Sequence, residues 1–269
     1  FAIGSGLIFG AVFLVSLLLV KQIFALLVAI IVAIALVELA AAFRIAGRRV
    51  PRVGVVLGGL VVVAGAYFWG AEGMLLGLFA GSALLTAWRL IEGLVPNWET
   101  PPRTLIRDVF SGLFTLVYVA FLASFTVLLV EAENGQWWVF ALVVIVVSVD
   151  VGAYAAGVTL GKHKMTPRIS PNKTWEGFAG AAIVAMAVGT VVAIFALDQP
   201  WWVGIILGVV VLFTATGGDL TESLIKRNLG VKDMSSWIPG HGGFLDRLDS
   251  LLPSAVGVYG VALVLGAVS

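Results

Sequence analysis

Residues 23–43 read IFALLVAIIVAIALVELAAAF, an apolar run with a single charged side chain, Glu38. A helix rises about 1.5 Å per residue and the hydrocarbon core of a bilayer is about 30 Å thick, so about 20 apolar residues can cross it. The composition of the whole chain agrees, because 61% of its residues are hydrophobic and 12% are charged. Soluble domains have about 45–50% apolar and about 25% charged residues. A water-soluble fold is therefore excluded.

Similar apolar runs recur along the chain and predict an all-α, polytopic transmembrane helical bundle with about nine spans. The alternation typical of a membrane β-barrel is lacking. Residues 1–269 are expected to form a single integral membrane domain. The predicted spans are Ala2–Val20, Ile23–Phe43, Val53–Gly70, Gly73–Ile91, Ile106–Val130, Trp137–Leu160, Gly177–Leu197, Trp201–Gly217 and Leu251–Val268.

Basic residues predict the orientation of the chain. All of the 16 lysines and arginines except Lys21 fall in alternate breaks between the predicted spans. Such residues accumulate in cytoplasmic loops. We therefore expect a multi-pass protein of the cell inner membrane with its active site at the cytoplasmic helix ends. The chain has no cysteine, which excludes disulfides, and its two histidines alone cannot form a zinc site.

Polar motifs concentrate in the second half of the chain, residues 137–269, beginning with Asp150 inside a predicted span. A charged residue at the centre of a membrane helix costs about 2.5–3.5 kcal/mol on translocon scales, so its presence indicates function. Asp150 is expected to face a polar cavity. Glu38 is a second charged residue inside a predicted span and therefore also a functional candidate. It lies near the predicted cytoplasmic end of its helix, where it could reach interfacial water.

The cytoplasmic link of residues 161–176 contains a Ser-Pro turn followed by Lys173 and Thr174. Their position just before a predicted helix suggests phosphate contacts from both residues. The alternative for Thr174 is that its hydroxyl caps the helix.

The last predicted link, residues 218–250, brackets a glycine-rich turn with carboxylates. Asp219 follows one span, whereas Asp246 and Asp249, three residues apart, share a face of the next helix. Mg²⁺ typically takes one or two carboxylates together with substrate phosphates. These residues therefore suggest a magnesium site; helix capping and pairing with Arg247 or Lys226 are the alternatives.

Glycines surround His241 in this link, and they permit a tight turn whose N–H groups attract phosphate oxygens. A hinge is the alternative for the turn. His241 could hydrogen-bond a phosphate or carry a proton, and a structural hydrogen-bond donor is the alternative. Lys226 could neutralise a polyphosphate or form an i, i+4 pair with Glu222. The other residues predicted to act on phosphates here are Arg227, Lys232, Gly242 and Gly243.

Residues 223–249 resemble the signature of the phosphatidate cytidylyltransferase (CDP-diacylglycerol synthase) family. The matching positions are a serine, Lys-Arg, Lys-Asp, and a His-Gly-Gly block closed by Asp-Arg and a final Asp. Residues 150–161 and 170–177 are similar to two further family blocks, with Asn172 where a lysine is common. The resemblance implies Mg²⁺-dependent transfer of a cytidylyl group from CTP to phosphatidate.

By this resemblance, Asp219 and Asp246 are the metal-binding pair, and they act in catalysis with Lys173 and Asp249. The residues expected to bind the substrates are Asp150, Ser170, Lys173, Thr174, Ser223, Lys226, Arg227, Lys232, His241, Gly242, Gly243 and Arg247.

Two alternative functions stay open: a CTP-dependent lipid kinase, and a secondary transporter that uses Asp150 and Glu38. A prenyl transferase is disfavoured because no Asp-Asp-x-x-Asp motif occurs. A second metal or a monovalent cation could accompany Mg²⁺. Membrane lipid is an expected partner and nucleic acid is not, and the glycine-rich helices would permit a homodimer.

Overall fold

The computed structural model describes residues 13–18, 20–94, 102–235 and 242–268. The described residues are almost entirely helical, with one two-stranded sheet. Seven of the helices in this part of the chain are long and apolar enough to cross a membrane. They confirm the predicted helical membrane fold. The first predicted span, Ala2–Val20, lies mostly outside the described residues.

The chain divides into two compact units. Unit 1 comprises residues 1–131 and 228–246, and unit 2 comprises residues 132–227 and 247–269. A short helix, α9 (Leu245–Leu248), contains one of the three points at which the chain passes from one unit to the other.

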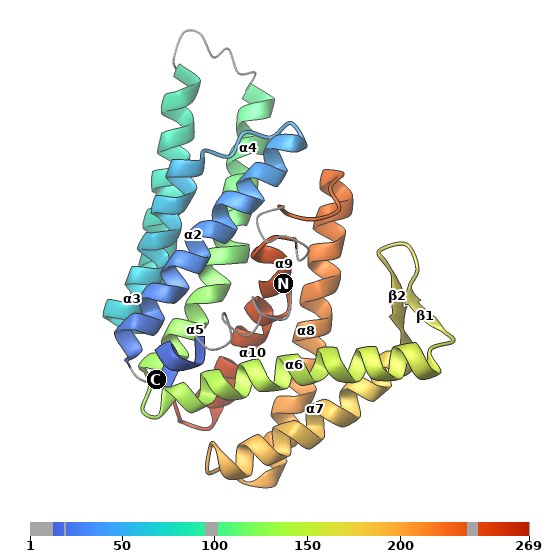
Figure 1. The fold of residues 1–269 in the computed structure, drawn as a ribbon. Helices are drawn as coiled ribbons and strands as arrows, with labels where there is room; N and C mark the ends of the chain where they lie inside the picture. Colours follow the sequence, from blue (N-terminus) through green and yellow to red (C-terminus); the bar gives the residue numbers. More distant parts are fainter. Residues whose placement is uncertain (1–12, 19, 95–101, 236–241, 269) are drawn as a thin grey trace. The chain divides into compact units, whose positions relative to one another are not determined.

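Unit 1 contains helices α2 to α5 (Figure 1). Helix α4 continues through a π-helical segment, η1, directly into α5, so together they cover the predicted span Ile106–Val130. Buried side chains of α2, such as Phe24, Leu36 and Leu39, form part of the apolar core. The bounds are α2 (Lys21–Ile45), α3 (Arg52–Leu94), α4 (Pro102–Thr115), η1 (Leu116–Phe121) and α5 (Leu122–Glu131).

Helix α3 is a hairpin of two helical arms. Its backbone leaves the helical conformation at Trp69 and Gly70, where Gly70 has a φ of 63°. Gly58 then lies against Gly81, and a β-carbon at position 81 would stand 2.6 Å from the Gly58 carbonyl oxygen. Glycine permits this close approach of two backbones. The arms match the predicted spans Val53–Gly70 and Gly73–Ile91.

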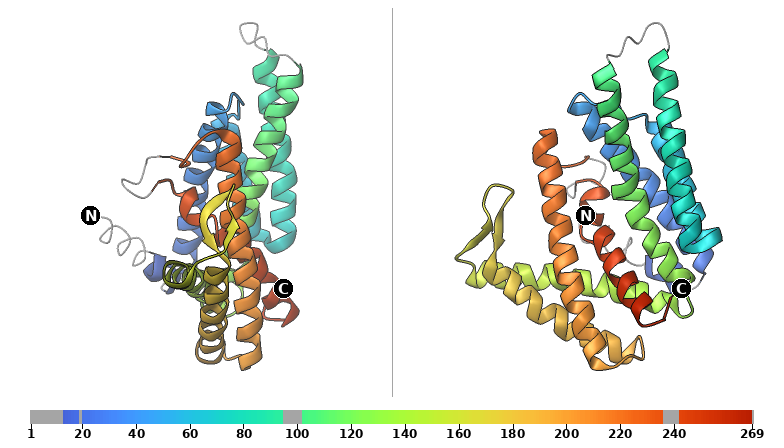
Figure 2. Two further views of the ribbon diagram at one scale, coloured as in Figure 1. Left: turned by 90° about the vertical axis from the view of Figure 1, so that its right-hand side faces the viewer. Right: turned by 180° about the vertical axis from the view of Figure 1, so that it is seen from behind.

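Unit 2 consists of four longer helices and the sheet (Figures 1 and 2). Helices α6 and α7 pack along each other through small residues, including Gly152 beside Ala181 and Gly180 beside Ala156. The bounds are α6 (Gly135–Leu160), β1 (Lys164–Thr166), β2 (Ser170–Thr174), α7 (Trp175–Phe195), α8 (Trp201–Leu229) and α10 (Leu251–Val264).

Two of the predicted links between spans contain regular structure. Residues 164–174 form the antiparallel β1–β2 hairpin instead of an irregular link. Helix α8 continues to Leu229, so the link predicted from Gly218 begins only after that residue. An i, i+4 ion pair, Lys226 Nζ to Glu222 Oε2 at 3.5 Å, supports the additional turns. The polar residues that follow the predicted span Trp201–Gly217 therefore do not end helix α8.

Candidate functional site

A pocket of about 300 Å³ lies within unit 2 and receives side chains from three helices and the hairpin. Asp150 and Tyr154 come from α6, Lys173 comes from β2, and Asp219 comes from α8. The full lining is Val149, Asp150, Ala153, Tyr154, Met165, Ser170, Asn172, Lys173, Thr174, Gly177, Phe178, Ala181, Ala215, Thr216 and Asp219. Five residues predicted from the sequence as site residues therefore line one pocket.

The start of α7 fixes the hairpin that carries Lys173. The Glu176 carboxylate accepts hydrogen bonds from the backbone N–H groups of Lys162 and His163, each at 3.1 Å, and contacts His163 Nδ1 at 2.6 Å. Thr174 Oγ1 accepts a hydrogen bond from the Gly177 N–H at 3.1 Å and caps α7. Thr174 thus has the capping role considered as its alternative, while it also lines the pocket.

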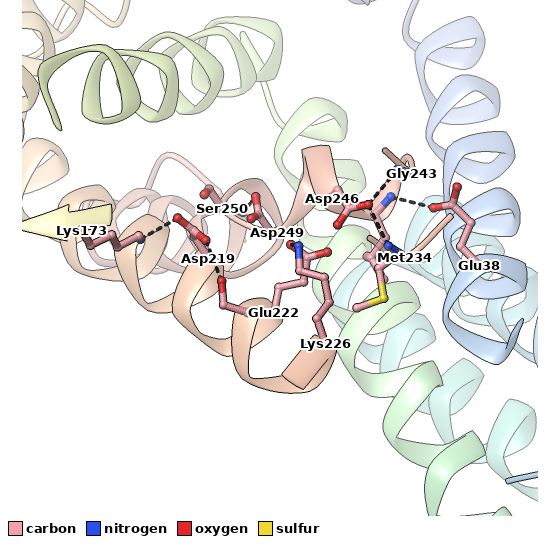
Figure 3. Close-up of polar contacts among 12 residues, drawn as sticks. Glu38, Lys173, Asp219, Glu222, Lys226, Met234, Gly243, Asp246, Asp249 and Ser250 are labelled. Carbon is pink, nitrogen blue, oxygen red and sulfur yellow. Dashed lines mark hydrogen bonds and ion pairs between the residues drawn. The ribbon is translucent and has the colours of Figure 1, made fainter. Parts of the chain in front are cut away.

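An ion pair joins two walls of this pocket: Lys173 Nζ lies 2.6 Å from Asp219 Oδ2 (Figure 3). The two side chains are 23% and 36% exposed, so a ligand can reach both. Asp150 lies within electrostatic range of Lys173, Asp219 and Asp249. One lysine thus stands among three aspartates, and this region of unit 2 has an excess of negative charge that favours a cation.

The polar turns of α8 organise the carboxylates further. Ser223 Oγ donates to Asp219 Oδ1 at 3.3 Å, one helical turn away. Glu222 is fully buried, and its carboxyl group lies beside that of Asp249. The Ser250 N–H also donates to Asp249 Oδ1 at 2.6 Å. The position of Glu222 beside Asp249 was not predicted from the sequence, although its i, i+4 spacing to Lys226 placed both on one helix face.

A different set of carboxylates holds the glycine-rich turn in unit 1 (Figure 3). Glu38 is 1% exposed, and its carboxylate accepts hydrogen bonds from Phe244 N at 3.1 Å, Leu245 N at 2.9 Å and Ser235 Oγ at 2.5 Å. Oδ2 of Asp246 accepts from Gly243 N at 2.7 Å and from the N–H of residue 234 at 3.0 Å. Two acidic side chains therefore fix the backbone of the turn.

Both described glycines of this turn are required by its geometry. Gly242 has a φ of 74°, which L side chains rarely adopt. A β-carbon on Gly243 would lie 2.8 Å from Glu38 Oε2. The glycine pair therefore reflects a positive φ and a close carboxylate.

These contacts change two expectations. Glu38 could have reached interfacial water by its position in the sequence, but it is buried against the turn. The N–H groups of residues 243–245 were expected to attract phosphate, yet carboxylates of the protein already accept their hydrogen bonds. Phosphate binding by this turn stays a prediction, and through these N–H groups it would require displacement of the carboxylates.

The other predicted residues have more varied positions. Arg227 is exposed in the last turn of α8, and Lys232 is exposed in the segment after it. Arg247 lies in α9. His241 is outside the described residues.

The donor set suits Mg²⁺ chemically. In the described ranges, no group of three or more histidine, aspartate or glutamate side chains is arranged to hold a metal ion. Mg²⁺ needs fewer protein ligands, because it keeps waters and binds substrate phosphates. Asp219 belongs to unit 2 and Asp246 to unit 1, so their joint role as a metal pair stays a prediction.

Comparisons with known proteins agree with the sequence motifs. The chain is 39% identical over 263 residues to the phosphatidate cytidylyltransferase of Mycobacterium bovis, covering 96% of this chain and 86% of that protein. It is 38% identical over 263 residues to the enzyme of the same name from Mycobacterium leprae, covering 95% and 84%. For the Bacillus subtilis enzyme of that name, the identity is 38% over 159 residues, covering 55% and 58%. The sequence profile described as the cytidylyltransferase family matches residues 2–265. Since this match extends over nearly the whole chain, the protein belongs to the cytidylyltransferase family.

Proposed function

We propose that the protein is a phosphatidate cytidylyltransferase, which converts CTP and phosphatidate into CDP-diacylglycerol and pyrophosphate. The single observation that carries this proposal is the pocket of unit 2, where Lys173 pairs with Asp219 beside Asp150 on apolar helices. The names of the relatives, which match over nearly the whole chain, support the same reaction.

The reaction needs positioning and charge neutralisation more than an enzyme nucleophile. An anionic phosphate oxygen of phosphatidate attacks the α-phosphorus of CTP, forming a new P–O bond. The bond from the α-phosphorus to the oxygen that bridges to the β-phosphate breaks, and pyrophosphate leaves. Because both reactants are anions, lowering their repulsion and holding them in line supply most of the catalysis.

Lys173 has the position for this task. Its ammonium group, exposed to the pocket, can exchange the Asp219 carboxylate for a phosphate oxygen. Asp219 and Asp246 are the residues we assign to Mg²⁺, which, when bound, neutralises phosphate oxygens and stabilises the leaving group. The carboxylates of Asp150 and Asp249 could bind a second cation.

The membrane solves the problem of the lipid substrate. We propose that the chain crosses the cell inner membrane nine times, with the basic ends of its helices in the cytoplasm. The acyl chains of the substrate would then stay in the bilayer. The phosphate would then meet soluble CTP at the helix ends. The distribution of arginine and lysine supports this orientation.

The decisive test incubates the purified protein with phosphatidate, Mg²⁺ and CTP labelled at the α-phosphate. The label should enter a lipid, with release of unlabelled pyrophosphate. Transfer of label from the γ-phosphate would instead indicate a lipid kinase, and absence of chemistry together with substrate movement would indicate a transporter. Asp198→Asn is a matched control for Asp219→Asn, because Asp198 is exposed in the short segment between α7 and α8.

A further inference from the structure

A second pocket, of about 830 Å³, lies entirely within unit 1 where α2 ends and α3 begins. Three arginines from this junction line it together with one tryptophan and one glutamate. We name it the arginine pocket, and its lining is Arg44, Gly47, Arg49, Val50, Pro51, Arg52, Val53, Trp88 and Glu92. We propose that the arginine pocket binds the phosphate headgroup of an anionic membrane lipid.

The walls of the arginine pocket are fixed by contacts with residues of α4. Arg107 Nη2 donates to the Gly47 carbonyl oxygen at 2.6 Å, and Arg48 Nη1 donates to Ser111 Oγ at 3.3 Å. The Arg49 N–H donates to Asp108 Oδ1 at 3.0 Å, while Asp108 Oδ2 holds the buried Arg89 at 2.8 Å. The connection between α2 and α3 is therefore fastened to α4 and does not depend on the pocket arginines for its shape.

The three pocket arginines are left available by this arrangement. The side chains of Arg44, Arg49 and Arg52 form no hydrogen bond or ion pair with any other residue in the described ranges, and Arg44 and Arg52 are exposed. A guanidinium group presents a fork of N–H donors that matches two oxygens of a phosphate. Three such groups around one pocket indicate a phosphate-bearing ligand.

Among the described lining residues, one side chain is acidic, and it does not neutralise these arginines. Glu92 Oε1 accepts a hydrogen bond from Trp88 Nε1 at 2.9 Å, and Glu92 Oε2 lies 3.9 Å from Arg89 Nη1. Arg89 itself is buried, and its Nε and Nη1 have no hydrogen-bond acceptor among the described residues. Positive charge therefore exceeds negative charge in the pocket, while the buried Arg89 behind it is paired with Asp108.

The place of the pocket favours a lipid as the source of the phosphate. Helices α2 and α3 both qualify as membrane spans, so their junction lies at a membrane boundary, where lipid headgroups are concentrated. Val53 and Trp88 add apolar and amphipathic surface of the kind found at that depth. Basic pockets between membrane helices are known to bind anionic headgroups.

The test measures lipid binding to the full-length protein in detergent by native mass spectrometry. The probe is dioleoyl phosphatidylglycerol, with dioleoyl phosphatidylcholine as the zwitterionic comparison. We expect R44Q/R49Q/R52Q to bind the anionic lipid at least about tenfold more weakly than the unaltered protein. The variant R44K/R49K/R52K should keep part of the affinity, because it keeps the charges and loses the fork geometry.

A matched control removes the same charge elsewhere. Lys162, Lys164 and Arg168 lie exposed in and beside the β-hairpin, and K162Q/K164Q/R168Q should leave the affinity nearly unchanged. An equal loss in both variants would overturn the proposal, because net charge alone would then explain binding. Millimolar inorganic phosphate that displaces the lipid completely would also overturn it, since a soluble anion would then be the ligand.

Discussion

Two sets of carboxylates, one in each unit, differ in their partners. In unit 1, the buried Glu38 and the Oδ2 atom of Asp246 accept hydrogen bonds mainly from backbone N–H groups of one turn. In unit 2, Asp219 forms an ion pair with Lys173. The Asp150 carboxylate is close enough to repel the carboxylates of Asp219 and Asp249. A carboxylate satisfied by the backbone fixes a loop, whereas carboxylates that repel one another are stabilised by an added cation. Four substitutions test this difference, from the largest expected effect to the smallest.

Asp219→Asn should give the largest loss. It removes a charge that we assign to cation and phosphate positioning, so turnover should fall roughly 10²–10³-fold, as for loss of one preorganised electrostatic group. Transfer of α-label into lipid measures the rate, and circular dichroism with size-exclusion chromatography checks folding. Asp198→Asn should retain normal turnover. Near-normal turnover of Asp219→Asn would remove this aspartate from the mechanism.

Glu38→Gln should act mainly on stability. The amide keeps the shape but loses the charge that accepts from two N–H groups and a hydroxyl, and charge-assisted hydrogen bonds contribute about 1.5–3 kcal/mol each. We expect the free energy of unfolding to fall by about 2 kcal/mol, measured by denaturation in detergent. The exposed Glu72 in the same unit provides the control, Glu72→Gln. If Glu38→Gln proved as stable as the unaltered protein, Glu38 would not clamp the turn.

Gly243→Ala tests the close approach of that turn to Glu38. The added β-carbon would meet the carboxylate at 2.8 Å, and overpacking of this kind costs about 1–3 kcal/mol. We expect the lower part of that range, since a side chain can shift more easily than backbone. Gly260→Ala in α10 has no atom within 4 Å of the new carbon and should be neutral or slightly stabilising. Equal thermal midpoints for the two variants would contradict the packing argument.

Ser223→Ala should have the smallest effect. It removes a 3.3 Å hydrogen bond to Asp219 Oδ1, a contact at the long end of the normal range. Turnover should fall only a few-fold, and the Mg²⁺ concentration for half-maximal activity should rise. A loss as large as that of Asp219→Asn would show that the serine hydroxyl itself contacts a substrate.

The predicted spans depend on local apolar runs, and the structure follows these runs closely. The break between the arms of α3 lies within two residues of its predicted place, because the helix is interrupted at Trp69 and Gly70, next to Glu72, which interrupts the apolar pattern. The motif around Asp150, Lys173 and Asp219 also converges on one pocket. Asp150 was recognisable because a charged residue is costly in an apolar helix, and Lys173 because it follows a Ser-Pro turn just before a predicted helix.

Contacts between distant residues were beyond sequence reasoning. Glu38 and Leu245 are separated by 207 positions, and nothing in either segment indicates the other. The β-hairpin was missed because β2 contains polar and proline residues without clear alternation. The arginine pocket was not predicted, because its basic residues already fitted the predicted membrane orientation of the chain. Only the structure shows which arginines bind the backbone and which do not.

The hairpin of α3 also bears on how the chain enters the bilayer during synthesis. Gly54 lies beside Trp88, so the two arms stay together up to the open end of the hairpin, and in the orientation proposed above only the tip, with Glu72, would have to be translocated. The two arms can therefore leave the translocon as a single preassembled loop. A β-branched residue at Gly81 should force the arms to insert separately, and a glycosylation acceptor placed at the tip would report the slower passage.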